Sequence, residues 1–100
     1  MKTTQLLLIV SSLLVLNGCS KDYSPSAKDT AESMYQNACV QCHQKTTEGT
    51  IFTFTAEKAN VAYIQERIQS GSLMMPKFPN IKGESLNQLS DYILKNSVAN

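Results

Sequence analysis

The pentapeptide Cys39-Val40-Gln41-Cys42-His43 constrains this 100-residue chain more than any other stretch. Two thiols three positions apart lie on one face of a helical turn, and an imidazole directly follows the second thiol. This arrangement lets both sulfurs bond to the vinyl-derived carbons of one haem, with the imidazole beneath the iron. The C-x-x-C-H spacing therefore predicts one covalently attached c-type haem, held by Cys39 and Cys42, with His43 as an axial ligand.

Two other uses of a cysteine pair, a redox pair and a zinc site, fit the sequence less well. A thioredoxin-like redox pair would need a βαβ pattern around the motif. A structural zinc site needs four soft ligands, whereas the chain has three Cys and one His. Two functional alternatives stay open. One is a haem-based ligand sensor or small peroxidase whose distal ligand is absent or displaceable. The other is a structural or assembly lipoprotein that keeps the two cysteines as a thiol pair.

The N-terminus has the build of an export signal. Met1-Lys2 precedes an apolar run over residues 6–16 that is short for a membrane span. The run ends in Leu16-Asn17-Gly18-Cys19, which resembles the lipobox of bacterial lipoproteins. We therefore expect a signal peptide over 1–18 and a lipidated Cys19, with acyl chains such as palmitate holding the protein on a membrane. An uncleaved anchor helix with an incidental cysteine is the alternative.

Either interpretation of the N-terminus places the folded part outside the cytoplasm, on the periplasmic side of a bacterial membrane. Ser20 follows the cysteine, and by resemblance to lipoprotein sorting the absence of Asp there permits transfer to the outer membrane. Residues 19–28 are polar and contain a proline, which is typical of a flexible tether. The three cysteines are then all assigned, one to lipid and two to haem.

The remaining segment, 29–100, is short for a domain that relies on side chains alone for its core. The chain has no Trp, and a flat apolar haem would supply much of the missing core. A formal net charge of +1 without a basic stripe gives no indication of nucleic-acid binding.

Apolar periodicity predicts three helices in this segment and no sheet. Their expected ranges are 30–38 with Asp29 as N-cap, 56–70 capped by Thr55 or Thr53, and 85 to about 98 with a capping box formed by Ser85 and Gln88. Residues 51–55 alternate as a strand would but have no evident partner, so we expect an extended loop that lays Phe52 or Phe54 against the haem. The charges at Glu57, Lys58, Glu66 and Arg67 are assigned to solvated faces.

The stretch 71–80 holds two prolines together with Met74, Met75 and Phe78, so it is expected to be a loop that covers something apolar. A thioether is the second axial ligand of the iron in many c-type electron carriers, and it raises the reduction potential. We favour Met75 as that ligand because Pro76 fixes the backbone directly after it. Met74 stays open as the alternative ligand, and so does simple packing of both methionines against the haem.

These features together resemble the class I monohaem cytochromes c of the small bacterial type. The resemblance rests on the C-x-x-C-H motif, on Met75-Pro76-Lys77-Phe78 and on Tyr92-Ile93 in the last helix. It covers residues 29–98 and implies an all-α fold of three main helices around a covalently attached haem. It also implies that the first and last helices cross where Ala31 and Tyr35 meet Tyr92.

The resemblance further implies thioethers at Cys39 and Cys42 and axial ligation of the iron by His43 and Met75. With both axial positions filled by the protein, the iron has no open site for a substrate. We therefore expect a monomeric electron carrier in an exported respiratory chain, and not an enzyme. Its partners would be membrane-bound redox proteins, with a quinol-oxidising complex upstream and a terminal oxidase or reductase downstream.

Overall fold

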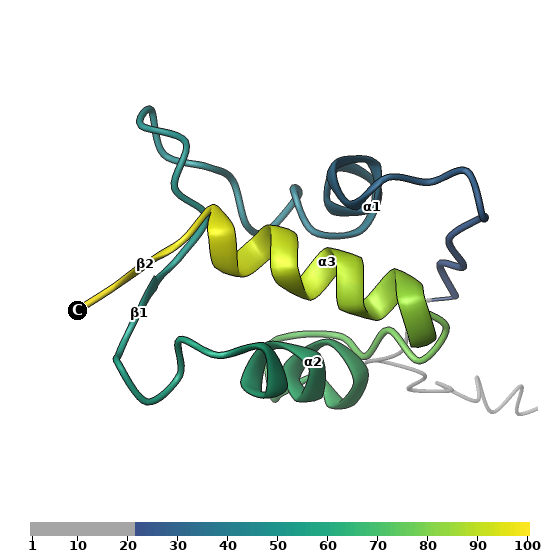
Figure 1. The fold of residues 1–100 in the computed structure, drawn as a ribbon. Helices are drawn as coiled ribbons and strands as arrows, with labels where there is room; N and C mark the ends of the chain where they lie inside the picture. Colours follow the sequence, from purple (N-terminus) through teal and green to yellow (C-terminus); the bar gives the residue numbers. More distant parts are fainter. Residues whose placement is uncertain (1–21) are drawn as a thin grey trace, which may run out of the picture.

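The computed structural model describes residues 22–100 and consists of three helices and two short strands. In chain order these are α1 (Ala31–Ala38), β1 (Thr53–Phe54), α2 (Val61–Ser70), α3 (Gly83–Lys95) and β2 (Val98–Ala99). Helix α3 contacts both other helices and lies between them in Figure 1. The expected three-helix, all-α architecture is confirmed.

The predictions for the N-terminus concern residues that the structure does not describe. The predicted signal peptide over 1–18 and the lipidation site Cys19 lie outside the described part of the chain. Within residues 22–100, no helix is long and apolar enough to cross a membrane. Residues 22–28, the described part of the expected tether, form no helix or strand, although Tyr23 packs against the core.

The buried core follows the predicted apolar stripes of the helices. The core residues of α2 and of α3 are spaced three or four positions apart, which places them on one face of each helix, whereas α1 contributes two adjacent residues. The segment between α2 and α3 adds Phe78 and Ile81. The helical core residues are Met34 and Tyr35 of α1, Ile64 and Ile68 of α2, and Leu86, Leu89 and Ile93 of α3. Met34 is fully buried.

Helices α1 and α3 cross at an aromatic contact. The ring centres of Tyr35 and Tyr92 lie 5.9 Å apart, and Ala31 packs against the same core. The ammonium of Lys45 lies 4.9 Å from the centre of the Tyr92 ring and donates a hydrogen bond to its hydroxyl group. The crossing implied by the family resemblance is confirmed, and the segment after the C-x-x-C-H motif is fastened to it.

The predicted N-caps of α1 and α3 are wrong. Helix α1 is capped by Thr30, whose hydroxyl oxygen accepts a hydrogen bond from the Ser33 amide at 3.1 Å. The Asp29 carboxylate instead accepts from the Ser26 amide at 2.8 Å, and this local turn occupies it before the helix begins. Helix α3 begins at Gly83 after Lys82, which makes no side-chain cap, so Ser85 lies inside the helix.

Helix α2 begins five residues later than predicted. Asn60, with extended backbone, caps it by accepting a hydrogen bond from the Tyr63 amide at 2.8 Å. The carbonyl of Thr55 is bonded by the Lys58 amide in a turn that precedes the helix. Asn60 is a stronger N-cap than Thr55 because its side-chain oxygen reaches the first free amides of the helix.

The expectation that 51–55 has no strand partner is also wrong. Strand β1 pairs in parallel with β2, with Thr53 opposite Val98 and Phe54 opposite Ala99. The last helix was predicted to run to about residue 98, but it ends at Lys95. This short pairing fixes the backbone on which Phe52 and Phe54 are carried.

Candidate functional site

The helices and loops enclose a cavity of about 690 Å³, within the size range of a cofactor pocket. Its walls come from all three helices, from the turn after α1, from β1 and from the loop after α2. The four residues predicted to hold a haem in the folded part, Cys39, Cys42, His43 and Met75, all line this cavity. The fold therefore brings the C-x-x-C-H motif and Met75, which are far apart in the sequence, to the wall of one cavity.

The two cysteines are positioned by the turn that ends α1. Cys39 caps the helix, and its carbonyl accepts hydrogen bonds from the amides of Cys42 at 3.2 Å and His43 at 2.9 Å. Both thiols are free, with Cys39 buried and Cys42 exposed. Burial, reinforced by the neighbouring Cys42, raises the pKa of the Cys39 thiol to about 11. Because a protonated thiol is a poor nucleophile, burial makes Cys39 a poor attacking thiol.

His43 is half-buried in the cavity wall. Its ring lies edge-on to Phe52 with the ring centres 4.8 Å apart, and the Tyr35 hydroxyl donates to its backbone carbonyl. Burial lowers the pKa of the His43 imidazole. The neutral imidazole, which carries the lone pair that a metal ion needs, is therefore favoured.

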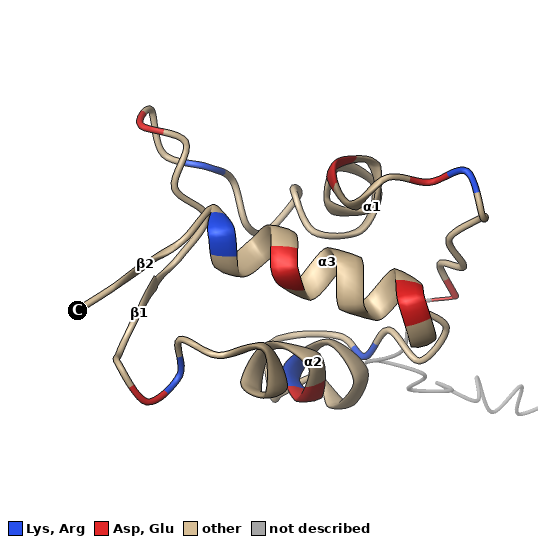
Figure 2. Cartoon of the chain, in the orientation of Figure 1, with Lys and Arg blue, Asp and Glu red and all other residues tan. Residues whose placement is uncertain are grey.

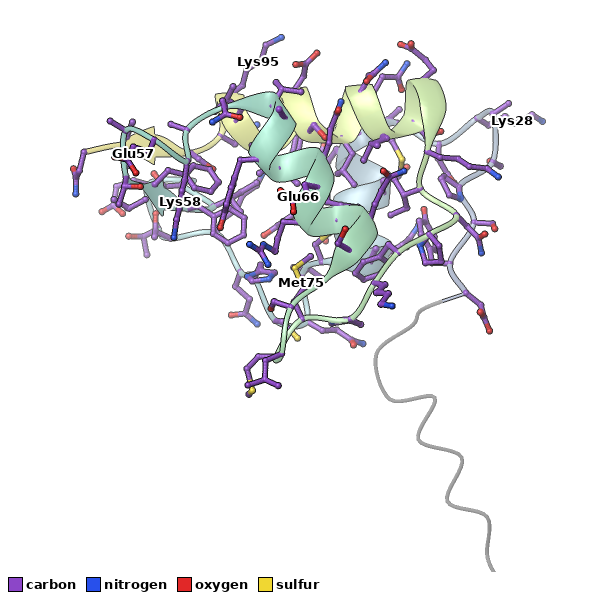
Figure 3. All side chains as sticks on the ribbon, turned by 90° about the horizontal axis from the view of Figure 1, so that it is seen from below. Lys28, Glu57, Lys58, Glu66, Met75 and Lys95 are labelled. Atoms are coloured by element: carbon purple, nitrogen blue, oxygen red, sulfur yellow. The ribbon has the colours of Figure 1, made fainter. Side chains whose placement is uncertain are left out.

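The loop after α2 carries Met75 and is bonded to the end of that helix. The Ser72 amide donates to the Met75 carbonyl at 3.0 Å, and the Met75 amide donates to the Ser72 hydroxyl at 3.2 Å. The Phe78 amide donates to the carbonyl of Ile68 at 2.9 Å. Figure 3 shows Met75 in this loop, on the underside of the molecule.

The two methionines of the loop differ in exposure. Met74 is 92% exposed, whereas Met75 is half-buried and packs against the hydrophobic core. A thioether held against the core is better placed for a stable bond than one at an exposed tip. This difference favours Met75 as the ligand, in line with the prediction from the sequence.

Gly71 makes the close packing of this loop possible. Its φ is +65° and its ψ is −163°, a combination essentially reserved for glycine. A Cβ atom at this position would lie 2.6 Å from the Met75 carbonyl oxygen. The helix predicted over 56–70 ends just before Gly71, but the sequence gives no sign of this backbone contact.

An aromatic wall continues from His43 across the cavity. The ring centres of Phe52 and Phe54 are 5.2 Å apart, and those of Phe54 and Tyr63 are 6.4 Å apart. All three rings line the cavity. Both Phe52 and Phe54, of which at least one was predicted to lie against the haem, therefore line the cavity in which the haem is expected.

One charged residue of the site, Arg67, was not predicted from the sequence. Arg67 was assigned to a solvated face together with Glu66, but its side chain is half-buried and lines the cavity. Glu66 is exposed, as predicted, and lies on the side of α2 seen in Figure 3. The available signal was the position of Arg67 four residues after Tyr63 and next to the buried Ile68, at the edge of the apolar stripe.

The residues present fit a covalently attached haem. A haem offers two vinyl groups and an iron with two free axial positions, and the cavity wall offers two free thiols, an imidazole and a thioether. The rest of the lining is mostly apolar, as the porphyrin faces require. The fold and this set of side chains are those of a small c-type cytochrome domain.

Comparison with known proteins identifies the family. A family model described as cytochrome c oxidase, cbb3-type, subunit III matches residues 26–93, which is more than half of the chain. The chain belongs to this family, so its cofactor is covalently bound haem c and its class of function is haem-based electron transfer. No curated protein and no solved structure matches the chain.

Proposed function

We propose that this protein is a single-electron carrier of an exported respiratory chain, with Cys39 and Cys42 as the thioether attachments and His43 and Met75 as the axial ligands. The observation that carries the proposal is the convergence of these four side chains on the wall of one apolar cavity. The chain has one C-x-x-C-H motif, so one haem per subunit is expected.

The bound haem supplies an iron that changes oxidation state by one electron. The protein supplies the environment. Partial burial lowers the pKa of His43, which favours the neutral imidazole with a nitrogen lone pair free for the iron. The loop hydrogen bonds of Met75 to Ser72 hold a weak thioether donor in position, and that soft donor favours the reduced state.

Both proposed axial ligands come from the protein, which makes a carrier the better assignment than an enzyme. A filled coordination sphere changes little between the two oxidation states and leaves no position for a substrate. Gln41, Cys42 and Met74 are exposed and also line the cavity, so they lie where the cavity meets solvent. This part of the cofactor edge is therefore where electrons would enter and leave.

The partners that we propose are membrane-bound redox proteins. The name of the matched family favours a terminal oxidase downstream, with a quinol-oxidising complex upstream. The charges of both signs are dispersed over the described part of the chain (Figure 2), so electrostatic steering toward a partner is expected to be weak. We expect a monomer, exported to the periplasmic side of a bacterial membrane and anchored there by lipid at Cys19.

A redox titration combined with carbon monoxide exposure tests the carrier assignment. The purified haem-loaded protein is expected to titrate as a reversible one-electron couple, and its reduced form is expected not to bind carbon monoxide on the time scale of mixing. Rapid carbon monoxide binding together with peroxide turnover would contradict the proposal and favour a ligand sensor or small peroxidase.

A further inference from the structure

The loop after α2 carries two adjacent apolar side chains at its tip that project into solvent. Leu73 is 94% exposed and Met74 is 92% exposed, whereas Val98, the third exposed large apolar residue of the described chain, is 49% exposed. Leu73 does not line the cavity, so holding the cofactor does not account for it. A contact that covers this apolar tip would be favourable because it removes apolar area from water.

The first residues of the described chain are fastened beside the same loop. The side-chain amide of Asn80 donates a hydrogen bond to the Asp22 carbonyl at 3.4 Å. Tyr23 packs against the hydrophobic core, and its hydroxyl donates to the Asp29 carboxylate at 3.4 Å. In Figure 1 the dark blue start of the described chain lies beside the turn that precedes α3. Residues 22–28 therefore follow the surface of the domain instead of forming a free tether.

This fastening leaves a short connection to the proposed lipid anchor. Cys19 precedes Asp22 by three positions. An extended chain spans at most about 3.6 Å per residue, so the acylated cysteine lies within about 11 Å of Asp22. That distance is comparable to the diameter of one helix, which is about 10–12 Å. The surface around Asp22 and Asn80 is consequently held against the membrane that takes up the acyl chains.

The charge of the loop segment suits the surface of a phospholipid membrane. Residues 68–83 contain Lys77 and Lys82, which are both exposed, and no acidic residue. Basic side chains close to a bilayer are attracted to anionic headgroups, and apolar side chains beside them enter the interface. The apolar tip and the basic residues thus lie on the segment that the N-terminal residues bring close to the bilayer.

We propose that Leu73 and Met74 insert into the headgroup region of the bilayer that holds the lipid anchor, and that this second contact fixes the orientation of the domain on the membrane. The inference rests on the proposed function, which assigns the anchor to Cys19. Met74 also lines the cavity where the cavity meets solvent, so insertion places the proposed electron-transfer edge at the level of the membrane surface. A membrane-bound redox partner then meets this edge with less orientational search.

Spin labels on the full lipidated, haem-loaded protein test this orientation. The protein is bound to vesicles of phosphatidylethanolamine and phosphatidylglycerol, and a nitroxide is attached at Leu73→Cys. Lys95→Cys is the matched control, because Lys95 is exposed and lies on the opposite side of the molecule from the Met75 loop in Figure 3. Oxygen is enriched in the bilayer and a nickel chelate stays in water, so their relative effects on the nitroxide report its depth.

We expect vesicles to lower the accessibility of the Leu73 label to the nickel chelate several-fold and to leave the Lys95 label unaffected. A Leu73 label that stays as accessible as the Lys95 label would overturn the proposal and leave the loop tip available to a protein partner. Protection of the Leu73 label in the absence of vesicles would also overturn it, and would assign the tip to a second copy of the chain.

Two measurements on the same samples separate this inference from the proposed function. Sedimentation with the vesicles reports the lipid anchor, and a protein that does not sediment overturns both the anchor and the inference. The redox titration and the carbon monoxide test report the carrier assignment, which Leu73→Cys is expected to leave unchanged because Leu73 does not line the cavity. A sedimenting electron carrier whose Leu73 label is fully accessible to the chelate overturns the inference alone.

Discussion

Met75→Ala is expected to leave the haem iron without its distal ligand. The ferric protein should lose the weak far-red absorption band that accompanies thioether ligation, and the reduced protein should bind carbon monoxide rapidly. The reduction potential should fall by on the order of 0.1 V or more, within the ~0.8 V range over which axial ligands tune haem iron. Optical spectroscopy and a redox titration of the purified variant measure all three effects.

Met74→Ala is the matched control for this prediction. Met74 is the neighbouring thioether, but it is 92% exposed, and its removal is expected to leave the far-red band and the potential nearly unchanged. The opposite pattern, with loss of the band in Met74→Ala and retention in Met75→Ala, would reassign the ligand to Met74. Retention of the band in both variants would show that neither methionine is essential to it.

Gly71→Ala is expected to be the most destabilising single substitution in the Met75 loop. The new Cβ would lie 2.6 Å from the Met75 carbonyl oxygen and 3.0 Å from the Lys77 amide nitrogen. The backbone conformation alone costs a non-glycine residue about 1–3 kcal/mol, and the contact with rigid backbone adds to that. Because the clash displaces the segment that holds Met75, the far-red band should weaken as the free energy of unfolding falls.

Gly49→Ala separates backbone strain from this clash. Gly49 also has a positive φ, +85°, but a Cβ there meets no atom within 4 Å. The Gly49→Ala substitution should lower the free energy of unfolding by about 1 kcal/mol without affecting the far-red band. Denaturant unfolding of the haem-loaded variants gives the comparison. A Gly71→Ala protein as stable as Gly49→Ala, with an intact band, would show that the contact between Gly71 and Met75 is unimportant.

The sequence predicted those parts of the structure that depend on local chemistry. The C-x-x-C-H motif places two thiols and an imidazole within one turn, and this needs no information from elsewhere in the chain. The apolar periodicity of Ile64 and Ile68, or of Leu89 and Ile93, likewise determines which helix face is buried. The crossing of α1 and α3 followed from the family resemblance.

Features that depend on competition between neighbouring groups were predicted less well. Both Asp29 and Thr30 are suitable N-caps, and the structure uses Thr30 because Asp29 bonds to the turn before it. The pairing of β1 with β2 joins segments more than forty residues apart, Thr53 with Val98, and only two residues of each take part. The alternation of residues 51–55 indicates the first strand, but its two-residue partner at 98–99 is too short to leave a periodic signal in the sequence.

The candidate site also contains contacts that residue types alone do not reveal. The close approach of Gly71 to the Met75 carbonyl is a contact between backbone atoms. The position of Arg67 on the cavity wall depends on where α2 begins and on how its stripe is turned toward the cavity. A charged side chain at the edge of an apolar stripe can face either solvent or a cavity, and only the fold distinguishes the two.

Acid extraction of the purified exported protein, followed by a pyridine haemochrome assay and a thiol count, tests the central claim most directly. The account predicts a coloured protein whose haem stays with the polypeptide, has the haemochrome spectrum of a doubly thioether-linked haem and leaves no free thiol at Cys39 or Cys42. A protein that is colourless, or that releases its haem into the extract and has two reactive thiols in residues 29–100, would contradict it.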